Sequence, residues 1–297
     1  MKLKLIIFPI FLLFLQKSFS ADISDSTSDK LFSRIIKSIF PKPDKTLNQP
    51  TLEFNYGFAK PSMKDFSNEE KLSPAYIGDI RYGFTRIYKE LDLVDENLIY
   101  LASEFAFLNN YSSHLKPASI PNIGITQDNW RFGFGMNNGF GYKLKNSNFI
   151  LYHSGAFVWS HIDFEGNAKL AGNQALLKMF DEKFRFGSIW EGGVKYQLTG
   201  PFYLKIGYEH SIVFPQFYWW KWFGSWTLEN LSQRWLDFFE TGFINHNPTT
   251  YPIYRFLIKN SLSLLLYELR REQMNWPFES EAPLNYDCFK MGITIIF

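Results

Sequence analysis

The sequence predicts an all-β fold, a transmembrane antiparallel up-and-down β-barrel of eight strands, or of ten, with an α-helical insertion before the last strand. Several segments alternate apolar and polar residues with the period of a β-strand. Aromatic residues make up 19% of the chain. After the N-terminal segment, however, no apolar run reaches the roughly 18 residues that a membrane-spanning helix needs. These observations favour strands with lipid-facing aromatic residues over spanning helices.

The N-terminus has the layout of a secretory signal peptide, predicted over residues 1–20. Lys2 and Lys4 precede an apolar run over 5–15, and small residues at 18 and 20 offer a cleavage site. The apolar run is too short to span a bilayer, which disfavours the alternative of an uncleaved anchor. Residues 21–50 are predicted to be a periplasmic linker, and residues 51–297 the barrel with its insertion.

Eight segments have the alternation and length of transmembrane strands. The clearest runs from residue 129 to residue 144, where Trp130 and Phe132 share one face while Arg131 and Gly133 share the other. The predicted strands are 51–60, 76–88, 97–108, 129–144, 148–161, 183–198, 202–213 and 285–297.

The faces of 97–108 are assigned from its alternation, whereas 148–161 is apolar on both faces and its orientation depends on a choice of face. In 97–108 we place Ile99, Leu101, Phe105 and Phe107 outward, which turns Glu104 inward. In 148–161 the outward face is predicted to carry Phe149, Leu151, Phe157 and Trp159.

The connections between these segments are alternately long and short. The short ones are 89–96, 145–147 and 199–201, and the long ones are 61–75, 109–128, 162–182 and 214–284. Short turns at one end and long loops at the other are typical of membrane barrels, whereas a soluble sandwich has no reason to alternate in this way.

The polar faces carry charges of both signs, which a soluble protein core would exclude. Eight strands leave room only for side chains or one small ligand. We therefore predict a lumen closed by ion pairs among Glu53, Asp79, Arg81, Glu104, Arg131, Arg185, Glu191, Lys195, Lys205, Glu209 and Lys290.

The last strand is amphipathic, with Phe289, Met291, Ile293 and Ile295 on one face, and it ends in Phe297. It resembles the closing strand of bacterial outer-membrane β-barrels, where such a strand is the assembly signal. The resemblance implies location in the outer membrane, contact with outer-membrane lipid, and recognition by the barrel-assembly machinery through this strand.

The long connection over residues 214–284 is predicted to be helical. Thr227 is the predicted N-cap of a first helix that ends near Thr241, and a second helix is predicted from Pro252 to Asn275. Three placements are open: flat on the outer membrane surface, as a lid over the barrel mouth, or packed on each other and on the barrel rim. A strand pair over 253–268 would instead give ten strands. The candidate membrane-interface residues are Trp219, Trp220, Trp222 and Trp226.

Composition excludes several kinds of site. The formal net charge of +2 comes without a basic stripe, so no nucleic acid partner is expected. Cys288 is the only cysteine, and no metal or nucleotide motif is present, so neither a metal nor a cofactor is expected. His161, beside Asp163 near the outer rim, is a weak catalytic candidate, because Ser160 points to the opposite side of its strand.

These features predict a non-enzymatic outer-membrane protein with a structural, adhesion or ligand-binding role and an unidentified ligand. The first alternative is a lipid-modifying outer-membrane enzyme similar to lipid A deacylases or acyltransferases. The second is a narrow channel, which a lumen of mixed charge disfavours.

Overall fold

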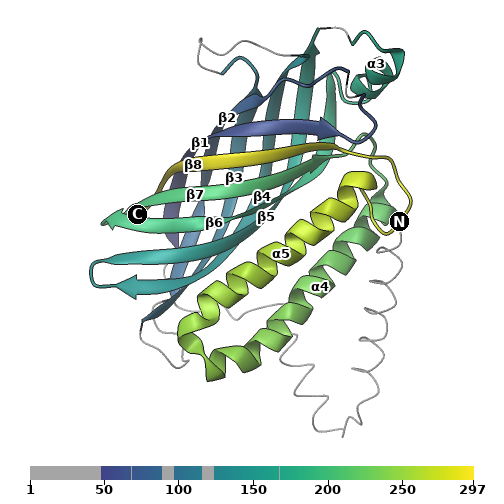
Figure 1. Ribbon diagram of the computed structural model, residues 1–297. Helices are drawn as coiled ribbons and strands as arrows, with labels where there is room; N and C mark the ends of the chain where they lie inside the picture. Colours follow the sequence, from purple (N-terminus) through teal and green to yellow (C-terminus); the bar gives the residue numbers. More distant parts are fainter. Residues whose placement is uncertain (1–47, 68, 89–96, 116–123, 167) are drawn as a thin grey trace, which may run out of the picture. The chain divides into compact units, whose positions relative to one another are not determined.

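The strands of this chain pair in sequence order and then close on themselves. In the computed structural model, which describes residues 48–67, 69–88, 97–115, 124–166 and 168–297, β8 pairs with β1. The eight strands of these ranges are β1 (Gln49–Met63), β2 (Ala75–Tyr88), β3 (Leu98–Ser112), β4 (Thr126–Leu144), β5 (Ser147–Glu165), β6 (Lys183–Thr199), β7 (Phe202–Val213) and β8 (Leu284–Ile296). Closure removes every sheet edge, and the predicted barrel is confirmed (Figure 1).

The two ends of the barrel differ as the loop lengths predict. Residues 145–146 and 200–201 form tight turns at the end where Phe297 donates its backbone N–H to the Pro50 carbonyl. The long connections at the other end carry the helices α3 (Ala171–Leu177), α4 (Trp219–His246), η1 (Pro248–Thr250) and α5 (Tyr251–Glu272). The predicted signal peptide and all but the last three residues of the predicted linker lie outside the described residues.

Most strand faces are oriented as predicted, with apolar side chains outward. Phe54, Tyr82, Phe132 and Met291 are all exposed, whereas the side chains that alternate with them point into the barrel. A soluble protein of this size does not leave a continuous belt of large apolar side chains in water. The exterior is therefore that of a transmembrane barrel.

The predicted orientation of β3 is wrong. Ile99, Leu101 and Phe107 are buried in the interior, while Glu104 is exposed on the outer face. Phe107 pairs with Arg81 and Glu104 pairs with Phe84, so the register with β2 decides the face. Because β3 is apolar on both sides, its own sequence does not distinguish the two orientations.

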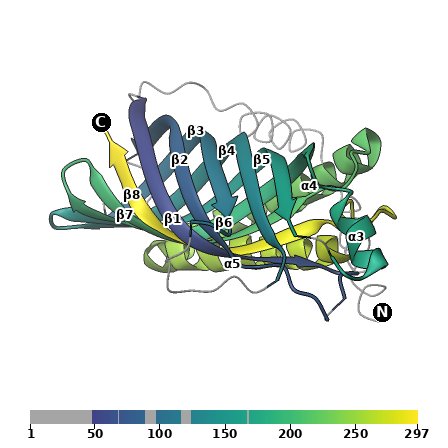
Figure 2. The same ribbon diagram turned by 90° about the horizontal axis from the view of Figure 1, so that it is seen from above.

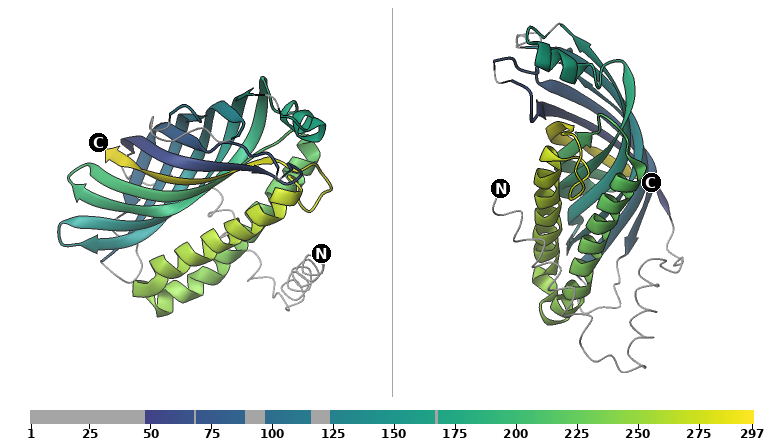
Figure 3. Two further views of the ribbon diagram at one scale, coloured as in Figure 1. Left: turned by 45° about the horizontal axis from the view of Figure 1, so that its top comes forward. Right: turned by 90° about the vertical axis from the view of Figure 1, so that its right-hand side faces the viewer.

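The insertion before β8 is a helical hairpin, so the alternative of a strand pair over 253–268 is wrong. The helix α4 starts earlier than predicted, since Trp222 N already donates to the Tyr218 carbonyl, and Thr227 lies inside it. As the third placement predicts, the two helices pack on each other, but they lie along the outer wall of the barrel rather than on its rim, with α5 against β4, β5, β6 and β7 (Figures 2 and 3). No helix in the described ranges is long and apolar enough to span a membrane.

Candidate functional site

Charged side chains inside the barrel form one connected network, the lumen network. Glu209 contacts Arg131 at 3.7 Å and also receives a hydrogen bond from Lys290, which contacts Asp79 at 3.2 Å. Asp79 contacts Arg81 at 2.9 Å.

The network continues toward the short-turn end of the barrel. Arg81 contacts Glu191 at 2.6 Å, and Glu191 contacts Lys205 at 2.9 Å. Lys205 contacts Glu53 at 2.9 Å, and Glu53 accepts a further hydrogen bond from Lys195. All of these side chains are buried, so each charge is balanced by a neighbour of opposite sign rather than by bulk water.

Two members of the predicted lumen network lie elsewhere. Glu104 is on the outer face of the barrel, as the register of β3 requires. Arg185 points inward near the loop end, where it donates to the Met179 carbonyl in the segment after α3. Neither residue forms an ion pair with the network among the described residues.

Apolar clusters lie above and below the lumen network. At the short-turn end, Ile99, Leu101, Ile150, Tyr203 and Ile296 pack together. At the loop end, a larger cluster includes Ile77, Tyr111, Phe180, Leu284 and Tyr286. Buried side chains thus lie at the level of the lumen network and on both sides of it.

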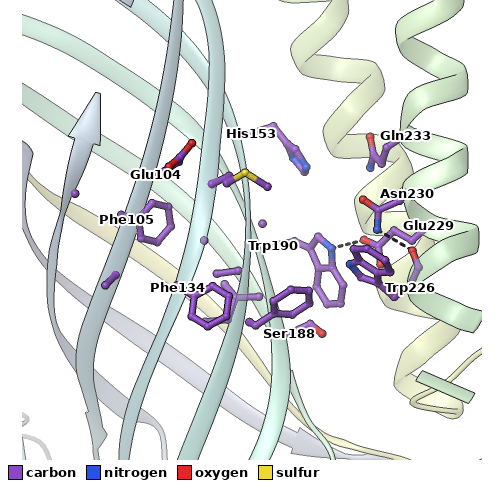
Figure 4. A pocket seen from close by; sticks show the side chains of 18 of the residues that line it. Glu104, Phe105, Phe134, His153, Ser188, Trp190, Trp226, Glu229, Asn230 and Gln233 are labelled. Carbon is purple, nitrogen blue, oxygen red and sulfur yellow. Dashed lines mark hydrogen bonds between the residues drawn. The ribbon is translucent and has the colours of Figure 1, made fainter. Parts of the chain in front are cut away.

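A groove of about 640 Å³ lies outside the barrel, between its wall and α4, and we call it the outer-wall groove (Figure 4). Its apolar side includes Phe84, Phe134, Met136 and Phe157. Gly155 opens the floor, because a Cβ atom placed there would meet nothing within 4 Å. The groove is therefore apolar along the wall and has room for a chain-like ligand.

The helix side of the outer-wall groove is polar and held by hydrogen bonds. The Trp190 indole N–H donates to Glu229 (Figure 4). The other Glu229 oxygen contacts Arg270 at 2.9 Å. The Arg270 guanidinium also lies 5.2 Å from the Trp190 ring centre. This arrangement fixes α4 and α5 against β6 and holds one wall of the groove in place.

His153 and Glu104 are two further polar groups of the outer-wall groove. The His153 Nδ1 atom lies 3.1 Å from Asn260 Oδ1 on α5. Glu104 projects from the opposite side, in the middle of β3, and no described residue forms a hydrogen bond or ion pair with it. An ionisable group in the apolar belt is costly without a partner, so Glu104 marks a candidate ligand contact.

The predicted catalytic candidate is not part of the outer-wall groove. His161 Nδ1 lies 3.6 Å from Asp163 Oδ1, while the buried Ser160 points into the barrel. His161 therefore has no serine from its own strand beside it, as the alternation predicts.

A second histidine cluster was missed by the sequence reasoning. His210 Nδ1 lies 2.9 Å from Asp287 Oδ1, which also accepts a hydrogen bond from Tyr267 on α5. Only the pairing of β7 with β8 brings His210 opposite Asp287, and no short-range signal reveals it. No group of described residues has the composition and geometry of a metal site.

The four candidate tryptophans divide into two pairs. Trp219 and Trp220 are exposed at the start of α4, whereas the ring centres of Trp222 and Trp226 lie 5.6 and 6.4 Å from that of Phe157 on the wall. The second pair attaches α4 to the barrel, and Trp226 also lines the outer-wall groove.

No protein-family model matches this chain, and no curated protein matches it either. Solved structures to which it is similar include the crystal structure of Neisserial surface protein A, at 10% identity, 84% coverage of this chain, 97% of that chain and a TM-score of 0.36. Another is Ail, the attachment invasion locus protein of Yersinia pestis, at 6% identity, 84% and 99% coverage and a TM-score of 0.33. At this sequence identity and TM-score, neither similarity supports a conclusion about this chain, and its fold is established by its own strand pairing.

Proposed function

We propose that this protein is an integral outer-membrane β-barrel with a sealed lumen that binds an amphiphile from the lipid phase in the outer-wall groove. Of the structural, adhesion and ligand-binding roles, ligand binding is the one that a specific feature supports. That feature is Glu104, an exposed carboxylate in the centre of the apolar belt, next to an apolar groove. The chemistry fits a ligand with an alkyl chain and a group that donates hydrogen bonds, such as an amine.

The barrel interior supports this placement of the site. The apolar clusters on either side of the paired charges interrupt the polar path along the described lumen, which disfavours the channel alternative. The enzyme alternative lacks a nucleophile beside His161, and we expect no change in the lipid composition of proteoliposomes that contain the protein. The proposed membrane location also rests on the apolar belt and on the predicted signal peptide.

Photolabelling tests the binding site directly. Proteoliposomes would be treated with a long-chain alkylamine that carries a diazirine, and cross-linked residues would be mapped by mass spectrometry. We expect labelling around Phe157 and Trp190 in the wild type, and at least a fivefold loss in Glu104→Gln. Gly155→Phe fills the groove, so it should reduce labelling by the alkylamine and by a chain-matched probe without the amine.

A matched control introduces a polar amide on the same outer face of β3, outside the outer-wall groove. Leu108→Gln should label like the wild type, because Leu108 is exposed but does not line the groove. Heat-modifiable mobility on a denaturing gel would verify folding of each variant. Equal labelling of wild type and Glu104→Gln would refute the proposed site.

The last strand is the proposed contact for the barrel-assembly machinery. Phe297 is 65% exposed at the short-turn end, directly after β8. Deleting Phe297 should slow assembly in cells while leaving detergent refolding of the purified chain unchanged. Equal slowing of both would point to a structural role of the residue instead.

A further inference from the structure

Several charged residues of the helical hairpin lie on its inner side. Lys259 and Arg270 of α5 are buried, as is Glu229 of α4. Arg270 pairs with Glu229 at 2.9 Å, and Lys259 pairs with Asp237 at 2.8 Å. A surface helix in water has the reverse arrangement, with charges outward and aliphatic residues against the protein.

The face of the hairpin that points away from the barrel is mostly aliphatic and aromatic. On α5, Ile253, Leu257, Leu264 and Leu265 are between 43% and 57% exposed. On α4, over the residues whose side chains the structure describes (219–237), the exposed large apolar residues are Trp219, Trp220, Phe223 and Leu231. This apolar surface continues the lipid-facing belt of the barrel, since α5 lies directly on the outer faces of β4 to β7.

Charged residues on this outer face are few in the described ranges. Glu268 and Glu272 lie in the last turns of α5, at the loop end of the barrel, where a polar head-group region is expected. Further along α4, Arg234 is exposed, and the Asp237 carboxylate is 45% exposed and pairs with Lys259.

The hairpin runs along the full height of the barrel wall. At the short-turn end, the Tyr142 hydroxyl donates to the Thr249 carbonyl at 2.7 Å. At the loop end, the Tyr267 hydroxyl donates to Asp287 at 2.9 Å. The 22 residues of α5 correspond to about 33 Å, which matches a hydrocarbon core of roughly 30 Å. Any bilayer that surrounds the barrel therefore also surrounds the hairpin.

We infer that the α4–α5 hairpin lies within the bilayer, flat against the barrel wall, and that lipid acyl chains cover its outer face. Mean hydropathy averages both faces of a helix, whereas only the outer face of this hairpin meets lipid. The inner face places its charges against one another and against the barrel, as intramembrane charges require. This inference rests on the proposed insertion of the barrel in a membrane.

Depth-dependent fluorescence quenching tests the placement. Single cysteines would be introduced as Leu257→Cys and Leu265→Cys and labelled with an NBD fluorophore in denaturant. The labelled protein would then be refolded into phosphatidylcholine vesicles. The native Cys288 would be replaced by serine in every variant. We expect strong quenching by chain-doxyl lipid and at least fivefold weaker quenching by aqueous iodide. The ratio of lipid quenching to iodide quenching should equal that of a label at Phe132→Cys on the barrel belt.

Two reference positions separate the possible failures. Lys143→Cys at the exposed short-turn end should be quenched by iodide. If the hairpin labels behave like position 143 while position 132 is quenched by lipid, the hairpin lies outside the bilayer and the inference is overturned. If position 132 is also quenched by iodide, the barrel is not inserted and the proposed function fails as well.

A second copy of the chain is the other possible cover for this face. In that case unlabelled Leu257→Cys protein would form a disulfide dimer on mild oxidation, and the label would resist both quenchers. That result would overturn the assignment to lipid. A monomer with a lipid-quenched label supports it.

Discussion

Replacing Glu209 with glutamine is the sharpest test of the lumen network. Glu209 is fully buried and contacts Lys290, Arg81 and Arg131. Among the described residues it is the only carboxylate within ion-pair distance of Arg131. Glutamine keeps the shape and its amide oxygen still accepts the hydrogen bond from Tyr111, but its amide nitrogen replaces the oxygen that accepts from Lys290, so the substitution removes the charge and one acceptor together.

The expected cost follows from the charge balance of the lumen network. The network holds four carboxylates and five cations, an excess of one positive charge. Glu209→Gln raises the excess to two, whereas Lys290→Met brings it to zero. Breaking a buried pair costs about 3–5 kcal/mol when it leaves an uncompensated charge. This corresponds to roughly two to three and a half powers of ten in the unfolding equilibrium constant.

Removing the cation is expected to cost less. Lys290→Met leaves carboxylates that Arg81 still contacts, so the cost should be about 1–3 kcal/mol. The double variant restores the original charge excess and should therefore be more stable than Glu209→Gln alone. Lys143→Met on the exposed turn should stay within about 0.5 kcal/mol of the wild type.

Urea titration of the refolded protein in vesicles, followed by tryptophan fluorescence and by heat-modifiable mobility, measures these differences. The ordering matters more than any single value. If Glu209→Gln costs no more than Lys290→Met, water compensates the lumen charges. The reasoning from a sealed, dry network would then be refuted.

Three further predictions concern other parts of the molecule. Gly207→Ala should cost about 1–3 kcal/mol, because its Cβ would lie 2.4 Å from the Tyr152 hydroxyl; Gly78→Ala, with open space around it, should change urea stability by less than about 0.5 kcal/mol. Tyr286→Phe removes a buried hydroxyl that donates to a glutamine of β4 at 2.8 Å, so the same titration should show a loss of about 1–3 kcal/mol. An asparagine of α3 donates to Glu70 and holds the pKa of that carboxyl below its usual value. The hydrogen bond between this asparagine and the Glu70 carboxylate should be fully present at pH values above the usual pKa of a carboxyl group, and it should be lost as pH falls through the lowered pKa of Glu70. Proteolysis of the loops should therefore rise as pH falls through that pKa. Glu70→Gln should abolish this pH dependence.

The sequence alone determined the architecture of this protein because the deciding signals are local. Strict alternation, as in Trp130, Arg131, Phe132 and Gly133, identifies a strand and both of its faces without any knowledge of its neighbours. Alternating loop lengths gave the up-and-down order. Charged residues on one face of each strand predicted a lumen that contains charged side chains, since such groups are unfavourable in contact with lipid.

Only the tertiary structure decided the positions that depend on neighbouring elements. The segment around Glu104 has apolar residues on both faces, so a shift of one residue in the register with β2 exchanges lipid and lumen. In the observed register Glu104 lines the outer-wall groove, whereas the sequence had predicted it in the lumen network. The hairpin likewise shows helical periodicity in its own sequence, but the surface on which it packs is set by contacts such as Phe157 with Trp222, between residues far apart along the chain.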